Sequence, residues 1–367
     1  PLQIVDKWRI SEENYLDYQK EVEQVIGSSI TAMGPDVVLH YLSLNLINPS
    51  NDQPGRAWLL PILRDHIKYA KLSTFINDMI PIVLHFQNCF DKLPKESVQL
   101  RVFQTVVDQI WSLLPHFAEL PRDLRQSFTD EFAQELCSLL YSTPELRTTI
   151  CNALKMLVES NLLYIDGVLS EDVILQEQFP VEEAKKNIEY LATKASNLLA
   201  VFFNIYTQTS PNSRGYILET IEFYLKITSS EDIEKTFNNV CTLLKDSMDK
   251  DAANFSNNNS TNNKNKSVPQ LTSTLLDILI TMVKYLPTSS YFALFSIFNA
   301  TIQLPNNLIQ KRSYRIISKL SELPSGSDAV SAHIGAIEDT IINNSHTVQA
   351  ASRASRLEAI KTVINLL

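Results

Sequence analysis

The sequence is poor in glycine, with only 7 among 367 residues. Doubly wound α/β folds, β-sandwiches and nucleotide-binding loops need more glycine, because their tight turns use residues that tolerate a positive φ. The phosphate-binding patterns GxGxxG and GxxxxGK[ST] and the nucleophile pattern GxSxG are all missing from the sequence. These absences argue against the common nucleotide-dependent and serine-hydrolase enzymes.

Cysteine is also scarce, and the chain lacks the spacing of a disulfide framework. The four cysteines are well separated along the chain: Cys89, Cys137, Cys151 and Cys241. We therefore expect reduced thiols and an intracellular protein. Since no apolar stretch is long enough to cross a bilayer, the sequence predicts no contact with membranes. The chain begins with Pro1 rather than methionine, which indicates a fragment of a longer protein.

Candidate metal ligands and catalytic acids are too dispersed to predict a site. His85 and Cys89 have the four-residue spacing of ligands on one helix. A structural zinc site needs four ligands, however, and no second pair lies near them. The acid pairs Glu12-Glu13 and Glu182-Glu183 occupy the expected first turns of helices, where negative charge suits the helix dipole. The sequence therefore predicts no metal, no cofactor and no enzymatic activity.

Apolar residues recur at intervals of three and four along most of the chain. In one predicted helix, between two prolines, these residues are Val98, Val102, Val106, Ile110 and Leu113, which share one face. Similar helices with short breaks recur in pairs at a spacing of about 40 residues, the period of HEAT and armadillo repeats. The pattern predicts an all-α fold, a right-handed α-solenoid of HEAT/armadillo-like antiparallel helix pairs.

One segment interrupts the helical periodicity. Residues 249–267 are polar and rich in asparagine, a composition that cannot bury enough apolar surface to fold. We expect HEAT-like repeats over residues 1–248, a disordered insertion at 249–267, and further HEAT-like repeats with a basic surface over 268–367.

Charge is unevenly distributed along the chain. The first 263 residues carry a net charge of −13, whereas residues 264–367 carry +4. Because equivalent helices of a solenoid line one surface, basic side chains of the last repeats could together form a phosphate-binding groove. The candidates for RNA contact are Lys311, Arg312, Arg315, Lys319, Arg353 and Arg356. Tyr314 is available to stack on a base. An ordinary solvated helix face is the alternative interpretation.

The least generic stretch of the sequence is PGRAWLLPILRDHI, residues 54–67. Pro54 and Gly55 predict a turn, and Trp58 with its apolar neighbours predicts the buried face of a capped helix. A proline early in this helix is tolerated, because the first amides of a helix have no partners within it.

This stretch resembles the hallmark of a domain found in the family of ribosomal RNA-processing protein twelve. The residues that match the hallmark are Gly55, Arg56, Trp58, Pro61, Arg64 and Asp65, which the resemblance implies to be structural or partner-binding positions. The domain would cover residues 30–245, and residues 310–320 are similar to the helix that follows it in the family.

The resemblance implies a non-catalytic HEAT/armadillo-repeat scaffold of pre-ribosomal particles, supporting pre-rRNA processing, small-subunit maturation and nuclear export of pre-ribosomal subunits. The implied partners are pre-ribosomal RNA, ribosome assembly factors and ribosomal proteins, with nucleoporins and a Ran-type GTPase as further ones. The implied location is the nucleus and nucleolus, with shuttling to the cytoplasm.

Two other functions are compatible with the residues themselves. The acidic charge of the first 263 residues suits a basic cargo or partner, as in a karyopherin-like transport adaptor that binds nucleoporin repeats or a small GTPase. A scaffold for phosphatase or vesicle-coat complexes is supported by fold analogy alone.

Overall fold

Helices form the regular structure of both parts of the chain. The computed structural model describes residues 1–10, 15–50, 54–169, 171–257 and 270–366, and no strand occurs in these ranges. By its internal contacts the chain divides into unit 1, Pro1–Leu191, and unit 2, Ala192–Leu367. The division falls inside one long helix, α13, Val181–Gln208. The predicted all-α fold is confirmed.

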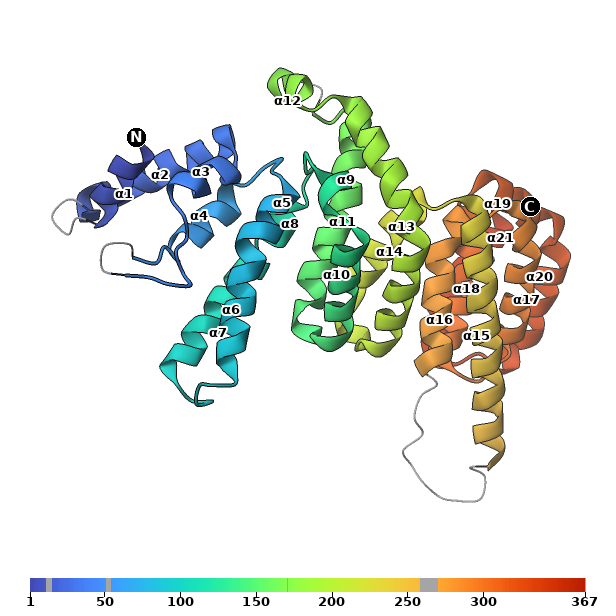
Figure 1. Cartoon of the computed structure of the whole chain (residues 1–367). Helices are drawn as coiled ribbons and strands as arrows, with labels where there is room; N and C mark the ends of the chain where they lie inside the picture. Colours follow the sequence, from blue (N-terminus) through green and yellow to red (C-terminus); the bar gives the residue numbers. More distant parts are fainter. Residues whose placement is uncertain (11–14, 51–53, 170, 258–269, 367) are drawn as a thin grey trace. The chain divides into compact units, whose positions relative to one another are not determined.

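Unit 1 is built from short and long helices in alternation. Up to α13, its helices are α1 (Leu2–Ile10), α2 (Tyr15–Met33), α3 (Pro35–Tyr41), α4 (Leu59–His66), α5 (Leu72–Thr74), η1 (Phe75–Met79), α6 (Ile80–Phe90), α7 (Val98–Trp111), α8 (Leu114–Phe117), α9 (Leu124–Ser127), α10 (Asp130–Ser142), η2 (Pro144–Leu146), α11 (Arg147–Ile165) and α12 (Val173–Gln178). Consecutive helices pack as pairs, and Figure 1 shows α6 and α7 running side by side.

Local sequence explains several helix ends in unit 1. The Ser97 hydroxyl accepts a hydrogen bond from the Leu100 amide at 3.0 Å and so caps α7. Before α6, the turn η1 is a π-helix, in which the Ile80 amide bonds to the Phe75 carbonyl. Pro81 follows at the start of α6. Since proline has no N–H to continue the α-helical ladder, the wider turn lets the chain pass it without breaking the helix.

The core of unit 1 is aromatic and aliphatic. Phe75, Phe117 and Phe128 are fully buried, and the ring of Phe75 lies 5.8 Å from that of Trp111. The predicted apolar face of α7 is correct only for its second half. Val98 and Val102 are 76% and 52% exposed, because the first turns of α7 bury Leu100 and stack Phe103 on Phe86 of α6 instead.

Unit 2 begins within α13 and continues with η3 (Pro211–Ser213), α14 (Gly215–Ile227), α15 (Ser230–Asn257), α16 (Gln270–Met282), η5 (Val283–Tyr285), η6 (Thr288–Ser290), α17 (Tyr291–Ile302), α18 (Asn307–Ser321), α19 (Pro324–Ala332), α20 (Ile334–Asn343), η7 (Asn344–His346), η8 (Ala350–Ser352) and α21 (Arg353–Ile364). Helix α18 lies at its centre and packs against α16, α17, α19 and α21. Two amides of its first turn are capped by the Asn306 side chain, at 2.9 and 3.1 Å.

The predicted asparagine-rich insertion falls partly inside the described residues. Helix α15 continues to Asn257, so residues 249–257 are helical, and residues 258–267 lie outside the described part. Helices α15 and α16, which flank the segment, pack against each other as a pair (Figure 1). The segment therefore joins two helices of unit 2. The predicted boundaries at 248 and 268, and the right-handed course of the whole solenoid, stay predictions.

Candidate interaction surfaces

Residues 54–56 of the motif form a non-helical segment that lies beside residues 44–46. The Arg56 amide donates a hydrogen bond to the Leu44 carbonyl at 2.7 Å. A Cβ on Gly55 would stand 3.3 Å from Leu46 Cδ2 and 3.4 Å from the Asn45 carbonyl oxygen, so a larger residue would need Leu46 to shift slightly. Glycine thus fits a close approach of two chain segments, and the turn forms at Ala57-Trp58 instead of at the predicted position.

Arg56 is the anchor of this segment. Its guanidinium donates two hydrogen bonds to the Asp6 carboxylate, at 3.0 and 2.6 Å, and a third to the Ser43 carbonyl at 2.9 Å. The Arg56 and Asp6 side chains are only 14% and 9% exposed. The pair thus ties α1 to the chain after α3. Sequence reasoning missed Asp6, because nothing local marks it as the partner of a residue 50 positions away.

The other motif residues divide between packing and surface. Trp58 occupies the N-cap position of α4 and is half-buried, and the next turn buries Leu59 and Leu60. Pro61 is exposed within the first turn of α4. Arg64 and Asp65 form an ion pair at 2.9 Å and are 50% and 59% exposed. Of the predicted motif positions, Gly55 and Arg56 have structural contacts, and Arg64 and Asp65 are accessible to a partner.

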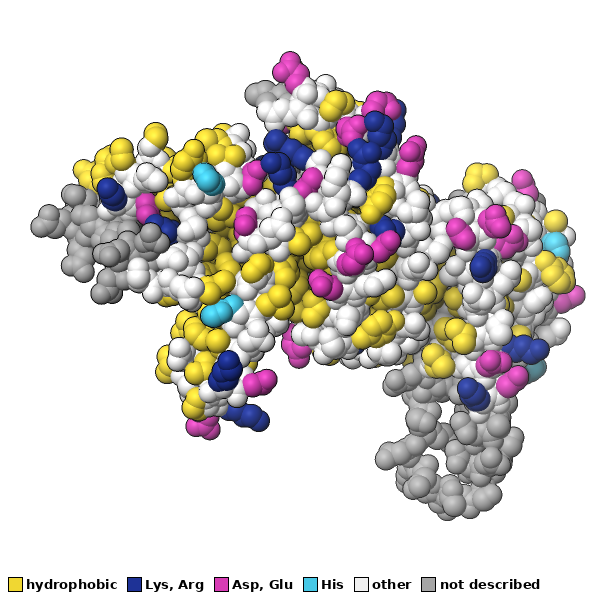
Figure 2. Space-filling view, in the orientation of Figure 1, with side chains coloured by type: hydrophobic (Ala, Val, Ile, Leu, Met, Phe, Trp, Pro, Cys, Tyr) yellow, Lys and Arg dark blue, Asp and Glu magenta, His cyan; other side chains and the backbone are white. Residues whose placement is uncertain are grey.

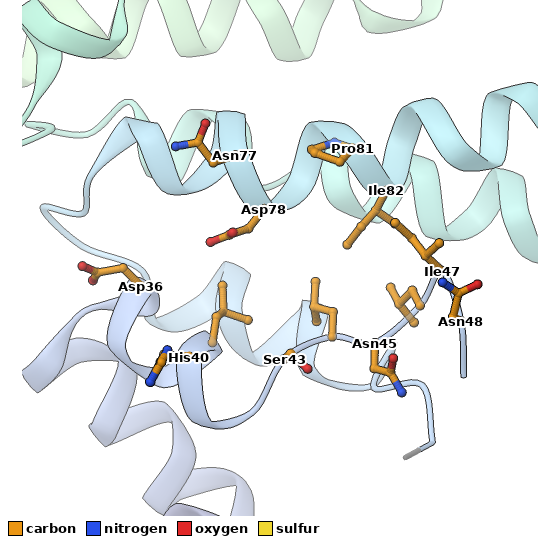
Figure 3. A pocket seen from close by; sticks show the side chains of 13 residues that line it. Asp36, His40, Ser43, Asn45, Ile47, Asn48, Asn77, Asp78, Pro81 and Ile82 are labelled. Atoms are coloured by element: carbon orange, nitrogen blue, oxygen red, sulfur yellow. The ribbon is translucent and has the colours of Figure 1, made fainter. Parts of the chain in front are cut away.

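A groove of about 510 Å³ opens beside the segment that Arg56 holds. It lies between α3, residues 43–48 and the η1–α6 turn (Figure 3). Asp36 and Asp78 lie at one end of the groove, and Ile47 and Ile82 lie together at the other. No residue of the groove was a sequence-based candidate, since its walls come from segments that are far apart in the chain.

The two carboxylates at the acidic end of the groove differ in their partners. Asp36 accepts a hydrogen bond from Lys71 Nζ at 2.9 Å. Partial burial, and then the negative charge of Asp36, raise the pKa of Asp78 above its ordinary value. Among the described residues Asp78 has no hydrogen-bond or ion-pair partner. A cation brought to this end of the groove would stabilise both carboxylates.

The basic helix α18 lies differently from what the sequence predicts. Arg312 donates to the Asp277 carboxylate through Nε at 2.7 Å and Nη2 at 2.8 Å, and Arg214 reaches the same carboxylate at 3.3 Å. Tyr314 is fully buried and bonds to Asn344. Arg312 is therefore committed to an internal ion pair, and the expectation that Tyr314 stacks on a base is wrong.

The Arg214–Asp277–Arg312 network extends to Tyr206. The Tyr206 hydroxyl lies 3.3 Å from Asp277 Oδ2, and the Arg214 guanidinium lies 4.1 Å from the centre of the Tyr206 ring. Burial, and then the charge of Asp277, raise the pKa of Tyr206 to about 12. These contacts make the network a structural element of unit 2.

The remaining RNA candidates differ in how accessible they are. Arg315 and Arg353 are exposed, and Lys319 bonds to Glu322 at 2.7 Å on the surface. Lys311 is half-buried. Arg356 donates to the Ile341 carbonyl at 3.0 Å and is half-buried, so it is not a free cation. Because α18 and α21 pack together, the two predicted clusters do lie on neighbouring helices.

Elsewhere in unit 1, opposite charges alternate rather than gather. Figure 2 shows Lys and Arg interspersed with Asp and Glu near α9, α12 and α13. Arg125 and Lys186 both pair with Glu183, and Lys185 pairs with Glu182 at 2.7 Å. This region therefore has no single-sign field that would attract a polyanion.

The described residues also contain no obvious reactive centre. No cluster of three or more His, Cys, Asp or Glu is arranged to hold a metal ion in the ranges described. Burial raises the pKa of the Cys137 thiol, and that of Cys241 to about 11, so both are protonated at neutral pH. Within the same ranges, none of the helices has the length and apolar character needed to cross a membrane.

Paired helices and grooved surfaces of this kind define a helical-repeat protein, the class whose stacked repeats present extended surfaces to partners. The chain belongs to the family of ribosomal RNA-processing protein 12, because the family model "Ribosomal RNA-processing protein 12, HEAT repeats" matches residues 1–209. The resemblance drawn from residues 54–67 is thereby confirmed, and so are HEAT repeats within residues 1–209.

Three curated relatives match the whole chain or nearly all of it. Ribosomal RNA-processing protein 12 of Saccharomyces cerevisiae is 59% identical over 366 residues, which cover 100% of this chain and 29% of the relative. A Schizosaccharomyces pombe counterpart is 33% identical, covering 100% of this chain and 31% of its own length. The human RRP12-like protein is 24% identical over 94% of this chain and 24% of its own. The chain thus spans under a third of the length of these relatives.

Proposed function

We propose that the chain is a non-catalytic scaffold of pre-ribosomal particles, supporting pre-rRNA processing, small-subunit maturation and nuclear export of pre-ribosomal subunits. The observation that carries the proposal is the 59% identity, along the full chain, to a yeast protein named for ribosomal RNA processing. The proposed place of action is the nucleus and nucleolus, with shuttling to the cytoplasm. A helical-repeat surface supports such a role, because it offers a long contact area that needs no single deep site.

Sedimentation of the tagged protein from its native cells tests this function. We expect it to co-sediment on a sucrose gradient with particles that contain pre-ribosomal RNA. A variant that exchanges the charges of the exposed pair Arg64 and Asp65 should no longer be found in the particle fractions, because this pair offers the accessible charges of the motif. Exchanging the charges of Glu182 and Lys185, an equally exposed pair of unit 1, is the matched control. A wild-type protein found only in the light fractions would refute the proposal.

Direct RNA contact is proposed for four of the six predicted cations, which are Lys311, Arg315 and Lys319 on α18 and Arg353 on the adjacent α21. The positions four residues apart on α18 support this, since they place the three cations along one line of the helix. Arg312 and Arg356 are left out because their side chains are engaged within the protein.

Reversing the charges of Lys311, Arg315 and Lys319 to glutamate should weaken RNA binding. Since each phosphate contact contributes about one unit to the salt dependence, we expect the log–log slope to fall by up to about three. The control reverses three other exposed lysines of unit 2, Lys235, Lys245 and Lys284, and so changes the net charge equally. Fluorescence anisotropy with a labelled single-stranded RNA at several salt concentrations gives both quantities. Equal losses in the two variants would leave no role for the α18 line.

Nucleoporin repeats and a Ran-type GTPase are proposed as further partners of the whole protein, alongside assembly factors and ribosomal proteins. A karyopherin-like adaptor role is the competing proposal, and the net charge of −13 over the first 263 residues supports it by favouring a basic partner. Capture of the chain on immobilised Phe-Gly repeats at physiological salt, without any pre-ribosomal association, would favour the adaptor.

A further inference from the structure

The groove beside the motif has an acidic end and an apolar end. One end carries the carboxylates of Asp36 and Asp78, and the other is apolar, formed by Ile47 and Ile82 (Figure 3). Asn45 and Asn77 add amide groups to its lining. An occupant must therefore present a cation at one end and an aliphatic group at the other.

One wall of this groove, segment 43–48, is fixed by contacts with Arg56 and Gly55. Segment 43–48 has no helical hydrogen-bond ladder. It is fixed instead by Arg56, which bonds to the carbonyls of Ser43 and Leu44 and to the carboxylate of Asp6. The close approach of Gly55 to Leu46 completes this support. A preformed concave surface loses less entropy on binding than one that must first become ordered.

The charge of the groove selects the class of occupant. Asp36 and Asp78 are the acidic side chains of its lining, and no lysine or arginine lines it. A phosphate-bearing ligand would be repelled, which disfavours RNA here. Lys71 compensates part of the charge of Asp36, whereas Asp78 has no such partner among the described residues. One net negative charge is thus left facing the groove.

We propose that this groove binds an extended basic segment of a partner protein, with an arginine or lysine between Asp36 and Asp78 and an aliphatic side chain against Ile47 and Ile82. An extended segment fits because alternate side chains of such a chain point the same way, so one can reach each end. The inference rests on the proposed function, in that it gives the chemistry of one class of protein partner of the scaffold.

Fluorescence anisotropy of the 367-residue chain with a short fluorescein-labelled peptide of repeated Arg-Ser-Val-Ser tests the groove. The serine spacers put arginine and valine on the same face of an extended chain. The variant Asp36→Asn/Asp78→Asn should bind this probe roughly tenfold more weakly, as expected for the loss of two partly exposed charge pairs. The control Asp91→Asn/Asp108→Asn removes two exposed carboxylates of unit 1 outside the groove. It has the same net charge and should bind within about twofold of the wild type.

A second variant guards against misfolding. Asn77 is an exposed residue of the groove without an ion pair, and Asn77→Arg places a cation there while leaving Asp36 and Lys71 intact. It should also weaken the basic probe, by about tenfold. Equal binding by wild type and Asn77→Arg, or equal losses in the groove and control variants, would overturn the proposal. Equally tight binding of a peptide with glutamate in place of arginine would also overturn it. So would binding of a labelled oligouridylate to the wild type that the groove variants abolish.

The experiments can refute the groove proposal and the scaffold proposal independently of each other. If the probe binds as expected but the native protein never enters pre-ribosomal particles, the groove stands and the proposed function falls. If the particles contain the protein but the groove variants bind the probe as tightly as the wild type does, only the groove proposal is refuted.

Discussion

Replacing Asp277 with alanine is expected to destabilise unit 2 by about 3–5 kcal/mol, the cost of leaving buried charges without their partner. Asp277 accepts hydrogen bonds from both Arg312 and Arg214, and these three side chains are between 6% and 18% exposed. Its loss leaves two guanidinium groups facing each other in the interior. Hydrogen exchange of the amides of α16 and α18 measures the effect within unit 2.

Asp328→Ala is the matched control for this prediction, because Asp328 is an exposed acid on α19 of the same unit. We expect it to change the stability by no more than about 0.5 kcal/mol. Converting the whole triad to apolar residues of similar size, Arg214→Met, Asp277→Leu and Arg312→Met, should restore much of the loss, since no unpaired charge is then buried. An Asp277→Ala protein as stable as Asp328→Ala would contradict the role we assign to the network.

Replacing Arg56 with alanine is the second change with a large expected effect, also about 3–5 kcal/mol locally. It leaves the buried Asp6 carboxylate unpaired and frees the Ser43 carbonyl. Arg56→Lys should recover only part of the loss, because an ammonium group cannot reproduce the planar two-bond geometry of the guanidinium. Hydrogen exchange in α1 and in residues 42–48 reports on the segment that Arg56 holds.

Arg64→Ala is the internal comparison for Arg56, since it removes an arginine of the same motif that is half exposed and paired on the surface. Its expected cost is below about 1 kcal/mol. The Arg56 variants should also weaken the basic peptide in the groove, because they loosen one wall of it. Similar stabilities for Arg56→Ala and Arg64→Ala would show that the Asp6 pair does not anchor this segment.

Both predictions concern partners that are far apart in the sequence. Arg312 and Arg315 belong to one basic run, and nothing within that run distinguishes them. The distinction comes from Asp277, 35 residues earlier, which α16 brings beside Arg312. The same holds for Arg56 and Asp6. Such pairs form only when helices pack, so a single sequence gives no signal for them beyond an acid among apolar neighbours.

The face of α7 shows a related limit. The three- and four-residue spacing correctly predicts a helix, and Val106 and Ile110 are buried as expected. Val98 and Val102 continue the same stripe but are exposed. The start of α7 buries Leu100 instead, and Phe103 stacks there on Phe86 of α6. A periodic apolar stripe predicts the helix, whereas the face that is buried at each turn depends on where the neighbouring helices pack.

The scarcity of glycine and the apolar periodicity by themselves determined that this protein is all-helical, and residues 54–67 determined its family. Those features act through neighbours a few residues apart, by hydrogen bonds within a turn and by side chains on one helix face. The tertiary structure alone decided which cations of α18 are free and which motif residues face solvent. It also decided that Asp36 and Asp78 share a groove, because only packing brings those distant residues within reach of one another.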